Sequence, residues 1–205
     1  MEQSAVMIQL LVNKVRDLGI KGCENAAQDE VAEVNIGGGH QLRWDWLRHR
    51  NIDPMFEKRI DFNTTALELE SGSVDIAICE QVIEHLHNTT FFLGELNRIL
   101  GRNKMLFISS ENLASLPNLL ALSVGMTPFS LQPCCGEFRG GFKRGPVNPD
   151  CDKPINHPCY SGMRGHVRVM TKRQMRELLE AAGFEVLRVR TWAFNHYMLF
   201  VCRKK

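Results

Sequence analysis

A short apolar segment that ends in ionisable residues is the part of the sequence best suited to chemistry. Val74 to Cys79 is almost entirely apolar, and the turn-forming stretch Glu70 to Ser73 precedes it. This pattern predicts a strand buried on both faces, as in a parallel sheet. Four polar residues follow closely: Glu80, Gln81, Glu84 and His85. Ligands bind at the carboxyl edge of open α/β sheets, so these residues are candidates for a site. A solvated joint between a strand and a helix is the alternative.

Two earlier segments could bring further groups to the same edge. The β-like run Val31 to Ile36 ends in three successive glycines: Gly37, Gly38 and Gly39. Glycine lets a ligand approach the backbone closely, although a flexible turn is the other interpretation. Asp53 stands before Pro54, which disfavours a helical conformation at Asp53. Asp53 is therefore expected to end a short strand with its carboxylate available, or else to cap a turn.

The flanking segments predict an α/β fold with a mostly parallel, Rossmann-like sheet, helices on both faces and an antiparallel last strand. Helical patterns occupy Thr89 to Leu100, capped by Asn88 or Thr89, and Thr171 to Ala182, capped by Thr171. An N-terminal helix is expected within residues 1–22. Further strands are expected at four places: Lys58 to Phe62, Met105 to Ile108, Phe184 to Val189 and His196 to Cys202.

Size and composition indicate one globular domain that spans residues 1–205. The net charge is only +2, so the total shows no footprint of a nucleic-acid or membrane partner. Arg139, Lys143 and Arg144 form a small basic group, but aromatic residues are not interleaved with them. No signal-peptide pattern is present, and the expected location is the cytoplasm. The oligomeric state is left open.

Residues 111–165 interrupt the alternation of strands and helices with an irregular insertion that is rich in glycine and proline. Within it, Ser130 to Met163 is expected to act as a lid over the pocket that binds the molecule on which the protein acts, because long loops in compact domains are usually functional. The insertion also holds potential zinc ligands: Cys134, Cys135, Cys151, His157 and Cys159. Paired C-x-x-C spacing is missing, so free thiols are favoured over a structural metal and no metal ligand is assigned.

These segments together resemble class I S-adenosylmethionine-dependent methyltransferases of the type 11 kind. The match covers about Glu33 to Cys202 apart from the insertion, and it is carried by SGSVDIAICEQVIEHL and GHVRVMTKRQMRELLEAAGFEVLRV. VNIGGG followed by WLRHRNID is similar to a short subgroup associated with glycan and polysaccharide pathways. Asn35 replaces the usual acidic residue, and Gln41 replaces the last glycine of the common pattern.

The resemblance implies S-adenosylmethionine as the cofactor and assigns it a set of residues. The three glycines would let the backbone pass close to the amino-acid moiety of the cofactor. Asp53 would accept hydrogen bonds from the ribose hydroxyls. Asp61 and Phe62 would border the adenine, although Phe62 could equally belong to the core. Glu80 and Gln81 would face the methionine end.

The acceptor side of the expected site involves four residues. Glu84 and His85 are the catalytic candidates, with His85 as the general base because the pKa of histidine is easily tuned near neutrality. A histidine that only bonds backbone at a helix start is the alternative. His166 and Arg168 are candidates for orienting a substrate, and a surface salt bridge explains them at least as well. The expected activity is methyl transfer to a small molecule, possibly a sugar or a lipid-linked glycan, and the alternative is a non-catalytic binding module of the same fold.

Overall fold

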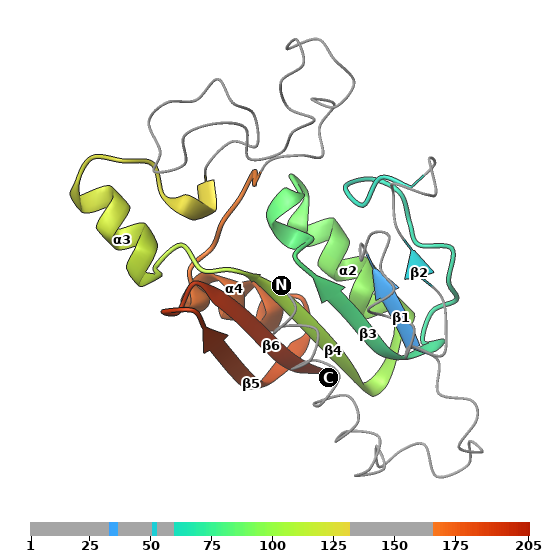
Figure 1. The fold of residues 1–205 in the computed structure, drawn as a ribbon. Helices are drawn as coiled ribbons and strands as arrows, with labels where there is room; N and C mark the ends of the chain where they lie inside the picture. Colours follow the sequence, from blue (N-terminus) through green and yellow to red (C-terminus); the bar gives the residue numbers. More distant parts are fainter. Residues whose placement is uncertain (1–32, 37–50, 53–59, 132–165) are drawn as a thin grey trace, which may run out of the picture.

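The computed structural model describes residues 33–36, 51–52, 60–131 and 166–205, and these residues form one six-stranded sheet (Figure 1). In chain order the strands are β1 (Glu33–Ile36), β2 (Asn51–Ile52), β3 (Val74–Glu80), β4 (Leu100–Glu111), β5 (Phe184–Trp192) and β6 (Tyr197–Lys204). Across the sheet their order is β2-β1-β3-β4-β6-β5. Strands β2, β1, β3 and β4 pair in parallel, whereas β6 is antiparallel to both β4 and β5. The predicted mostly parallel sheet with an antiparallel last strand is confirmed.

β3 lies inside the sheet between β1 and β4, as its apolar sequence predicts. Ile76, Ala77, Ile78 and Cys79 are each 0% exposed, so both faces of the strand are buried. Burial of apolar side chains on both faces is the main source of stability for such a strand. The apolar sequence also determines where the strand ends. Its last residue, Glu80, lies at the edge of the sheet, and polar residues follow it.

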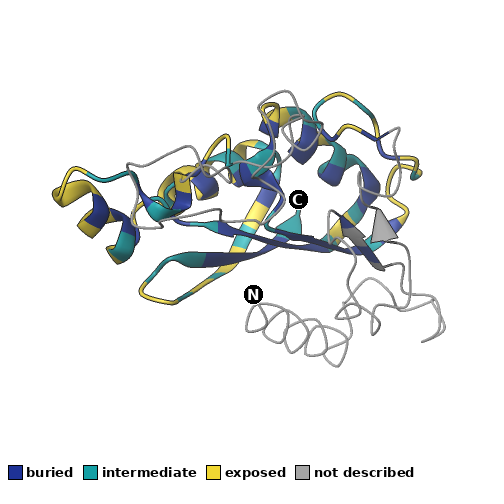
Figure 2. Cartoon of the chain, turned by 45° about the horizontal axis from the view of Figure 1, so that its top comes forward, coloured by how far each residue is buried: buried dark blue, intermediate teal, exposed yellow. Residues whose placement is uncertain are grey.

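Two helices cover one face of this sheet: α2 (Thr89–Ile99) and α4 (Lys172–Ala181) (Figure 2). Phe92, Leu96 and Leu179 pack in one core cluster with sheet residues such as Cys79 and Phe200. The residues that alternate with these on the strands, such as Ile78, are buried on the opposite face. The N-terminal helix expected in residues 1–22 lies outside the described residues, so a helical cover on that face is not tested.

Both helices begin at caps that the sequence contains. The Asn88 side chain accepts from the Phe91 amide at 3.2 Å, which makes Asn88 the cap of α2. Thr171 and Gln174 form a reciprocal capping box at the start of α4. These caps satisfy amides that would otherwise lack partners at the first helical turn, and they fix where each helix starts.

The expected strand at Lys58 to Phe62 is wrong in its described part. Residues 60 and 61 have no regular structure, and Phe62 enters a turn. The cause is local, because the Asp61 carboxylate accepts hydrogen bonds from the backbone and side-chain nitrogens of Asn63, at 2.9 and 2.8 Å. This side-chain bonding offers the backbone a turn in place of a sheet ladder.

The expected insertion begins one residue too early, since Glu111 is the last residue of β4. After it the chain forms helix α3 (Leu116–Ser123) and the short 3₁₀ turn η3 (Phe129–Leu131). The rest of the insertion, with its cysteines, lies outside the described residues. In the part of the chain that the structure describes, no helix is long and apolar enough to span a membrane.

Candidate active site

The carboxyl ends of the parallel strands define where a ligand of this sheet would bind. β1 is flanked by β2 on one side and by β3 on the other, so the chain reverses its direction of progress across the sheet at β1. Ligands of open α/β sheets bind outside the carboxyl ends of the strands at such a switch point. Ile36 pairs with Cys79, which brings the end of β1 beside Glu80. Glu80 is 4% exposed and is the last residue of β3.

A sharp change of backbone direction follows β3. Gln81 has a φ of 54°, in the left-handed region that non-glycine residues seldom adopt. Its amide still donates to the Ser109 carbonyl of β4 at 3.2 Å, so this turn is tied to the sheet. The 3₁₀ turn η2 (Ile83–His85) comes next and carries both predicted catalytic residues. The turn therefore holds Glu84 and His85 close to the end of β4.

The Glu84 carboxyl group is fully buried and held from two sides. Ser110 Oγ donates to Oε2 at 3.0 Å, and the Gln81 side-chain amide donates to Oε1 at 2.9 Å when oriented to satisfy both of its ends. Burial, with smaller contributions from the nearby charges of Glu111 and Glu80, raises the pKa of this carboxyl to about 8. Glu84 is therefore mostly protonated near neutral pH when no cation is near it.

His166 reaches this turn from a distant part of the chain. The main-chain carbonyl of Glu84 accepts from the amides of Val167 and Arg168, at 2.8 and 3.1 Å. His166 Nδ1 lies 2.7 Å from the Ser130 carbonyl oxygen, which can only accept. The proton of a neutral His166 ring is thus assigned to Nδ1, and Nε2 carries the lone pair.

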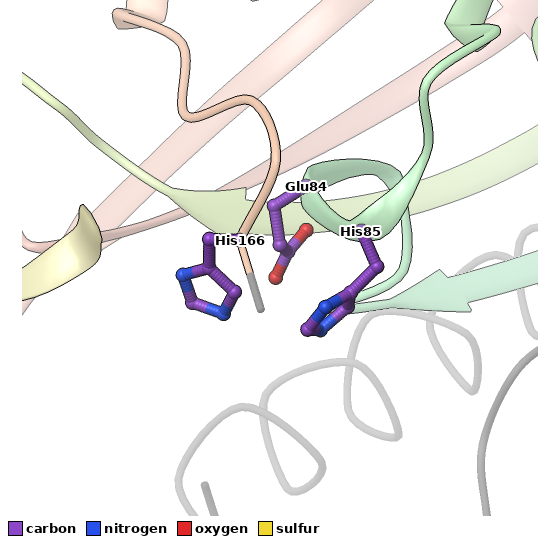
Figure 3. A group of neighbouring side chains, drawn as sticks. All are labelled: Glu84, His85 and His166. Carbon is purple, nitrogen blue, oxygen red and sulfur yellow. The ribbon is translucent and has the colours of Figure 1, made fainter. Parts of the chain in front are cut away.

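Glu84, His85 and His166 converge from these two segments (Figure 3). One donor atom from each residue lies within 4.8 Å of the other two. The two imidazole rings meet edge to face with their centroids 4.8 Å apart. Glu84 is buried, whereas both histidines are partly exposed. The structure therefore brings together two predicted catalytic residues and one predicted substrate residue in a single cluster.

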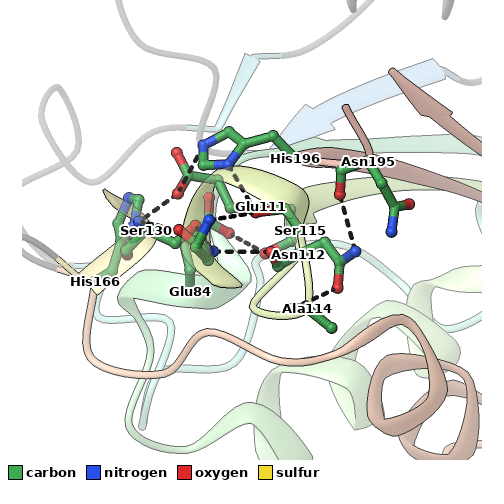
Figure 4. A network of polar contacts seen from close by, with 11 residues as sticks. Glu84, Glu111, Asn112, Ala114, Ser115, Ser130, His166, Asn195 and His196 are labelled. Atoms are coloured by element: carbon green, nitrogen blue, oxygen red, sulfur yellow. Dashed lines mark hydrogen bonds and ion pairs between the residues drawn. The ribbon is translucent and has the colours of Figure 1, made fainter. Parts of the chain in front are cut away.

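A second polar group borders this cluster at the end of β4. Glu111 Oε2 lies 3.5 Å from His166 Nδ1 and 3.7 Å from His196 Nε2, between the two imidazoles (Figure 4). His196 Nδ1 is 3.2 Å from Ser115 Oγ. The Asn118 side chain donates to the Ser130 hydroxyl at 2.8 Å and accepts from the Ser130 main-chain amide at 3.2 Å. These bonds fix Ser130, whose main-chain carbonyl contacts His166. The cluster thus rests on a connected polar network.

Other predicted site residues have partners of their own in the described part of the structure. The Phe62 ring is 3% exposed and packs 5.4 Å from the Phe92 ring, which matches the core interpretation that the sequence left open. Asp61 holds its own turn, and the Asn63 backbone bond lowers the pKa of its carboxyl. Arg168 is exposed, and its Nη1 lies 3.4 Å from Thr89 Oγ1. Gln81 contacts Glu84 and Ser110. Gly37, Gly38, Gly39 and Asp53 lie outside the described residues.

Among the residues of the network that were not predicted from the sequence are Ser110, Glu111, Ser130 and His196. A signal was available for the first two, because they end β4 beside β3 just as Glu80 ends β3. No local signal marks the other two. Their positions depend on the turn η3 and on the hairpin between β5 and β6.

The chain belongs to a methyltransferase domain family, whose profile it matches over residues 22–189. This agrees with the strand order, the switch point at β1 and the polar cluster at the carboxyl edge. Among curated proteins, none matches the chain significantly.

Solved structures of methyltransferases share the fold. An S-adenosylmethionine-dependent methyltransferase from Thermotoga maritima has a TM-score of 0.55 at 15% identity, covering 93% of this chain and 89% of its own. One from Mesorhizobium loti has a TM-score of 0.51 at 15% identity, covering 85% and 93%. The 1,6-didemethyltoxoflavin-N1-methyltransferase of Burkholderia thailandensis, solved with its namesake compound and S-adenosylhomocysteine, has a TM-score of 0.52 at 14% identity and covers 100% and 89%. At these identities the likeness concerns the fold.

Family and fold support S-adenosylmethionine as the cofactor, and the described carboxyl edge of the sheet fits it. The switch point lies where a nucleotide-like ligand of such a sheet binds. Gly37 to Gly39 follow β1 in the sequence, and Asp53 follows β2. Glu80 is the buried last residue of the neighbouring strand β3, and its carboxyl group is suited to accept a hydrogen bond from an amino group.

Proposed function

We propose that this protein transfers a methyl group from S-adenosylmethionine to a hydroxyl group of a small molecule. The observation that carries the proposal is the cluster of Glu84, His85 and His166 beside the carboxyl edge of β3. It sets a buried carboxyl and two imidazoles next to the switch point where the cofactor of this fold binds. Polar groups that can hold a hydroxyl and take its proton are what such a reaction requires.

When bound, S-adenosylmethionine supplies an activated methyl group, so the protein contributes mainly placement and proton transfer. A hydroxyl acceptor loses its proton as its oxygen takes the methyl group, and His85 is the side chain that we assign to receive that proton. Glu84, mostly protonated near neutral pH, is suited to donate a hydrogen bond to the acceptor. His166, held by the Ser130 carbonyl, is suited to orient it.

The acceptor that we favour is a sugar or a lipid-linked glycan. Support comes from the similarity of VNIGGG and WLRHRNID to the subgroup associated with glycan pathways. The polar lining of the cluster agrees, because sugars present several hydroxyls to imidazole and carboxyl groups. The proposed compartment is the cytoplasm, where the free buried thiols of Cys79 and Cys202 would stay reduced.

Two measurements, made one after the other, test the proposal. Calorimetry on the whole chain should first show binding of S-adenosylmethionine and of S-adenosylhomocysteine. Release of S-adenosylhomocysteine should then be measured against a panel of sugars, glycolipid head groups and, as a contrasting set, amines. Turnover of a hydroxylated compound from this panel would support a hydroxyl acceptor. Loss of that turnover in His85→Gln, but not in the exposed His87→Gln, would support His85 as the base.

The alternative is a non-catalytic module of the same fold. Asn35 and Gln41, which depart from the common cofactor pattern, are the observations that favour it. If neither cofactor form binds, methyl transfer is contradicted and the binding module becomes the better description. Cofactor binding combined with turnover on amines alone would instead contradict the hydroxyl acceptor.

A further inference from the structure

We propose that Glu84, His85 and His166 form a binding site for one divalent transition-metal ion, with Zn²⁺ as the representative. The sequence pattern assigned no metal ligand here, because His166 is remote from the other two residues in the chain. In the structure one carboxylate oxygen and two imidazole nitrogens lie within 4.8 Å of one another (Figure 3). Two imidazoles and one carboxylate are a donor set that Zn²⁺ and neighbouring metals accept while keeping open positions.

The spacing of the three donors is close to that of a bound ion. Bonds of about 2.0–2.2 Å to Zn²⁺ place two donor atoms of one ion no more than about 4 Å apart. The donors here span at most 4.8 Å, so a small inward rotation closes the gap. His85 is the side chain able to make it, because its ring is partly exposed, whereas Glu84 is fixed by burial.

His166 carries the outer contact that a metal-binding histidine usually has. Such a histidine donates its other ring N–H to a carbonyl or a carboxylate, which fixes the tautomer and the ring orientation. The His166 Nδ1 atom lies 2.7 Å from the Ser130 carbonyl oxygen, with the Glu111 carboxylate 3.5 Å away. The opposite nitrogen, Nε2, is left to bind the ion.

Glu84 is supported in the same way. Ser110 Oγ and the Gln81 amide orient its two carboxylate oxygens. Its side chain is 0% exposed, and a buried carboxylate needs a cation or a proton to compensate its charge. A divalent ion shared with two neutral imidazoles would supply that compensation. The main-chain bonds from Val167 and Arg168 to the Glu84 carbonyl hold the two ligand-bearing segments together before any ion arrives.

The site would also narrow the choice of acceptor, and this part rests on the proposed function. Three protein ligands leave coordination positions open, and an acceptor with adjacent oxygen atoms could occupy them. Coordination lowers the pKa of a bound hydroxyl and thereby eases its deprotonation. With the ion present, His85 would act as a ligand, and the acceptor oxygen held by the metal would lose its proton to solvent water, which reaches the partly exposed histidines, before the oxygen takes the methyl group.

Co²⁺ is the probe for the test, because its visible spectrum reports both the geometry and the type of ligand. The whole chain is treated with a chelator, dialysed and titrated with Co²⁺, and Zn²⁺ is then added as a competitor. Wild type and His87→Gln should take up one equivalent with weak visible bands and no thiolate charge-transfer band. His85→Gln and His166→Gln should bind at least about tenfold more weakly, since losing even an outer-shell partner costs about 10–100-fold in affinity.

Three outcomes overturn the inference: no uptake by the wild type, unchanged affinity in both histidine variants, or a strong thiolate-to-cobalt band that assigns the ion to cysteines. Melting temperatures confirm that each variant is folded. The test relies on the two partly exposed histidines, so it needs no substitution of the buried Glu84. Calorimetry with S-adenosylmethionine alone is run in parallel. Loss of the metal site would leave that binding intact, whereas failure of the proposed function would show as absent cofactor binding whatever Co²⁺ does.

Discussion

The main-chain oxygen of Glu84 accepts a hydrogen bond from the main-chain nitrogen of Arg168 at 3.1 Å, joining two segments that are far apart in the sequence. One segment is the turn after β3, which carries Glu84 and His85. The other precedes α4 and carries His166. Because the contact is made by backbone atoms, changing a single side chain of the cluster does not remove this link between the two segments. The side chains of the cluster can therefore be tested one at a time.

Replacing His85 should reduce turnover and leave cofactor affinity nearly unchanged. A positioned base contributes about 10²–10⁴-fold, so both His85→Ala and His85→Gln should lose about that factor, because glutamine cannot take a proton. Turnover and melting temperature are measured on the same samples, with His87→Gln as the control. A lower melting temperature with normal turnover per folded molecule would assign His85 a structural role. Sensitivity of the wild type to a chelator would separate the metal ligand from the free base.

Replacing Asp53 should weaken cofactor binding. Hydrogen bonds to a charged group contribute about 1.5–3 kcal/mol, so Asp53→Ala is expected to lower the affinity for S-adenosylmethionine by about tenfold or more. The matched control is Asp75→Asn, because Asp75 pairs with Lys104 near the amino end of β3, at the opposite edge of the sheet. Calorimetry gives the dissociation constants. Equal affinity in wild type and Asp53→Ala would remove Asp53 from the site.

Replacing Glu95 should destabilise the fold in a pH-dependent way. Its carboxylate accepts from Arg98 and from the Leu67 amide, at 2.8 and 2.9 Å, and these bonds hold the pKa of Glu95 below its usual value. A depressed pKa gives stability that is present above the unfolded value near 4.5 and is lost as the pH falls through the folded value. Glu95→Gln should therefore lower the free energy of unfolding by about 1 kcal/mol at pH 7.

Urea unfolding at several pH values checks this prediction. The difference between wild type and Glu95→Gln should shrink as the pH falls below about 4.5, because the wild-type carboxylate becomes protonated. Glu177→Gln removes the exposed partner of Arg173 and should leave the unfolding midpoint unchanged at every pH. A Glu95 difference that stays constant with pH would show that packing, and not ionisation, is responsible.

Removing the cap of α4 should also destabilise the protein. The Thr171 hydroxyl accepts from the Gln174 amide at 3.3 Å, and loss of an N-cap oxygen costs about 0.5–2 kcal/mol. Thr171→Ala is expected to show this loss in chemical unfolding, whereas Thr171→Ser keeps the oxygen and should stay close to wild type. Similar stability of the two variants would mean that the hydroxyl does not contribute through capping.

The amino-acid sequence by itself determined the elements that depend on near neighbours. β3 follows from a run of apolar residues, and α4 follows from its helical period and the Thr171 cap. The antiparallel pair β5 and β6 was also predicted, because the two runs are adjacent in the chain. Periodicity and capping act over a few residues, so the sequence displays them directly. The same reasoning predicted Glu84 and His85 as candidate site residues, since both follow β3 closely.

Only the tertiary structure decided which distant residues meet at the site. His166 joins Glu84 and His85 through main-chain bonds, and its ring is oriented by the carbonyl of Ser130, a group that every residue possesses. Glu111 reaches the cluster because β4 pairs with β3 in a particular register, which a sequence pattern does not specify. Local patterns contain no information about separations through space. Packing of the sheet and its connections supplied those separations, and with them the chemistry that the cluster can perform.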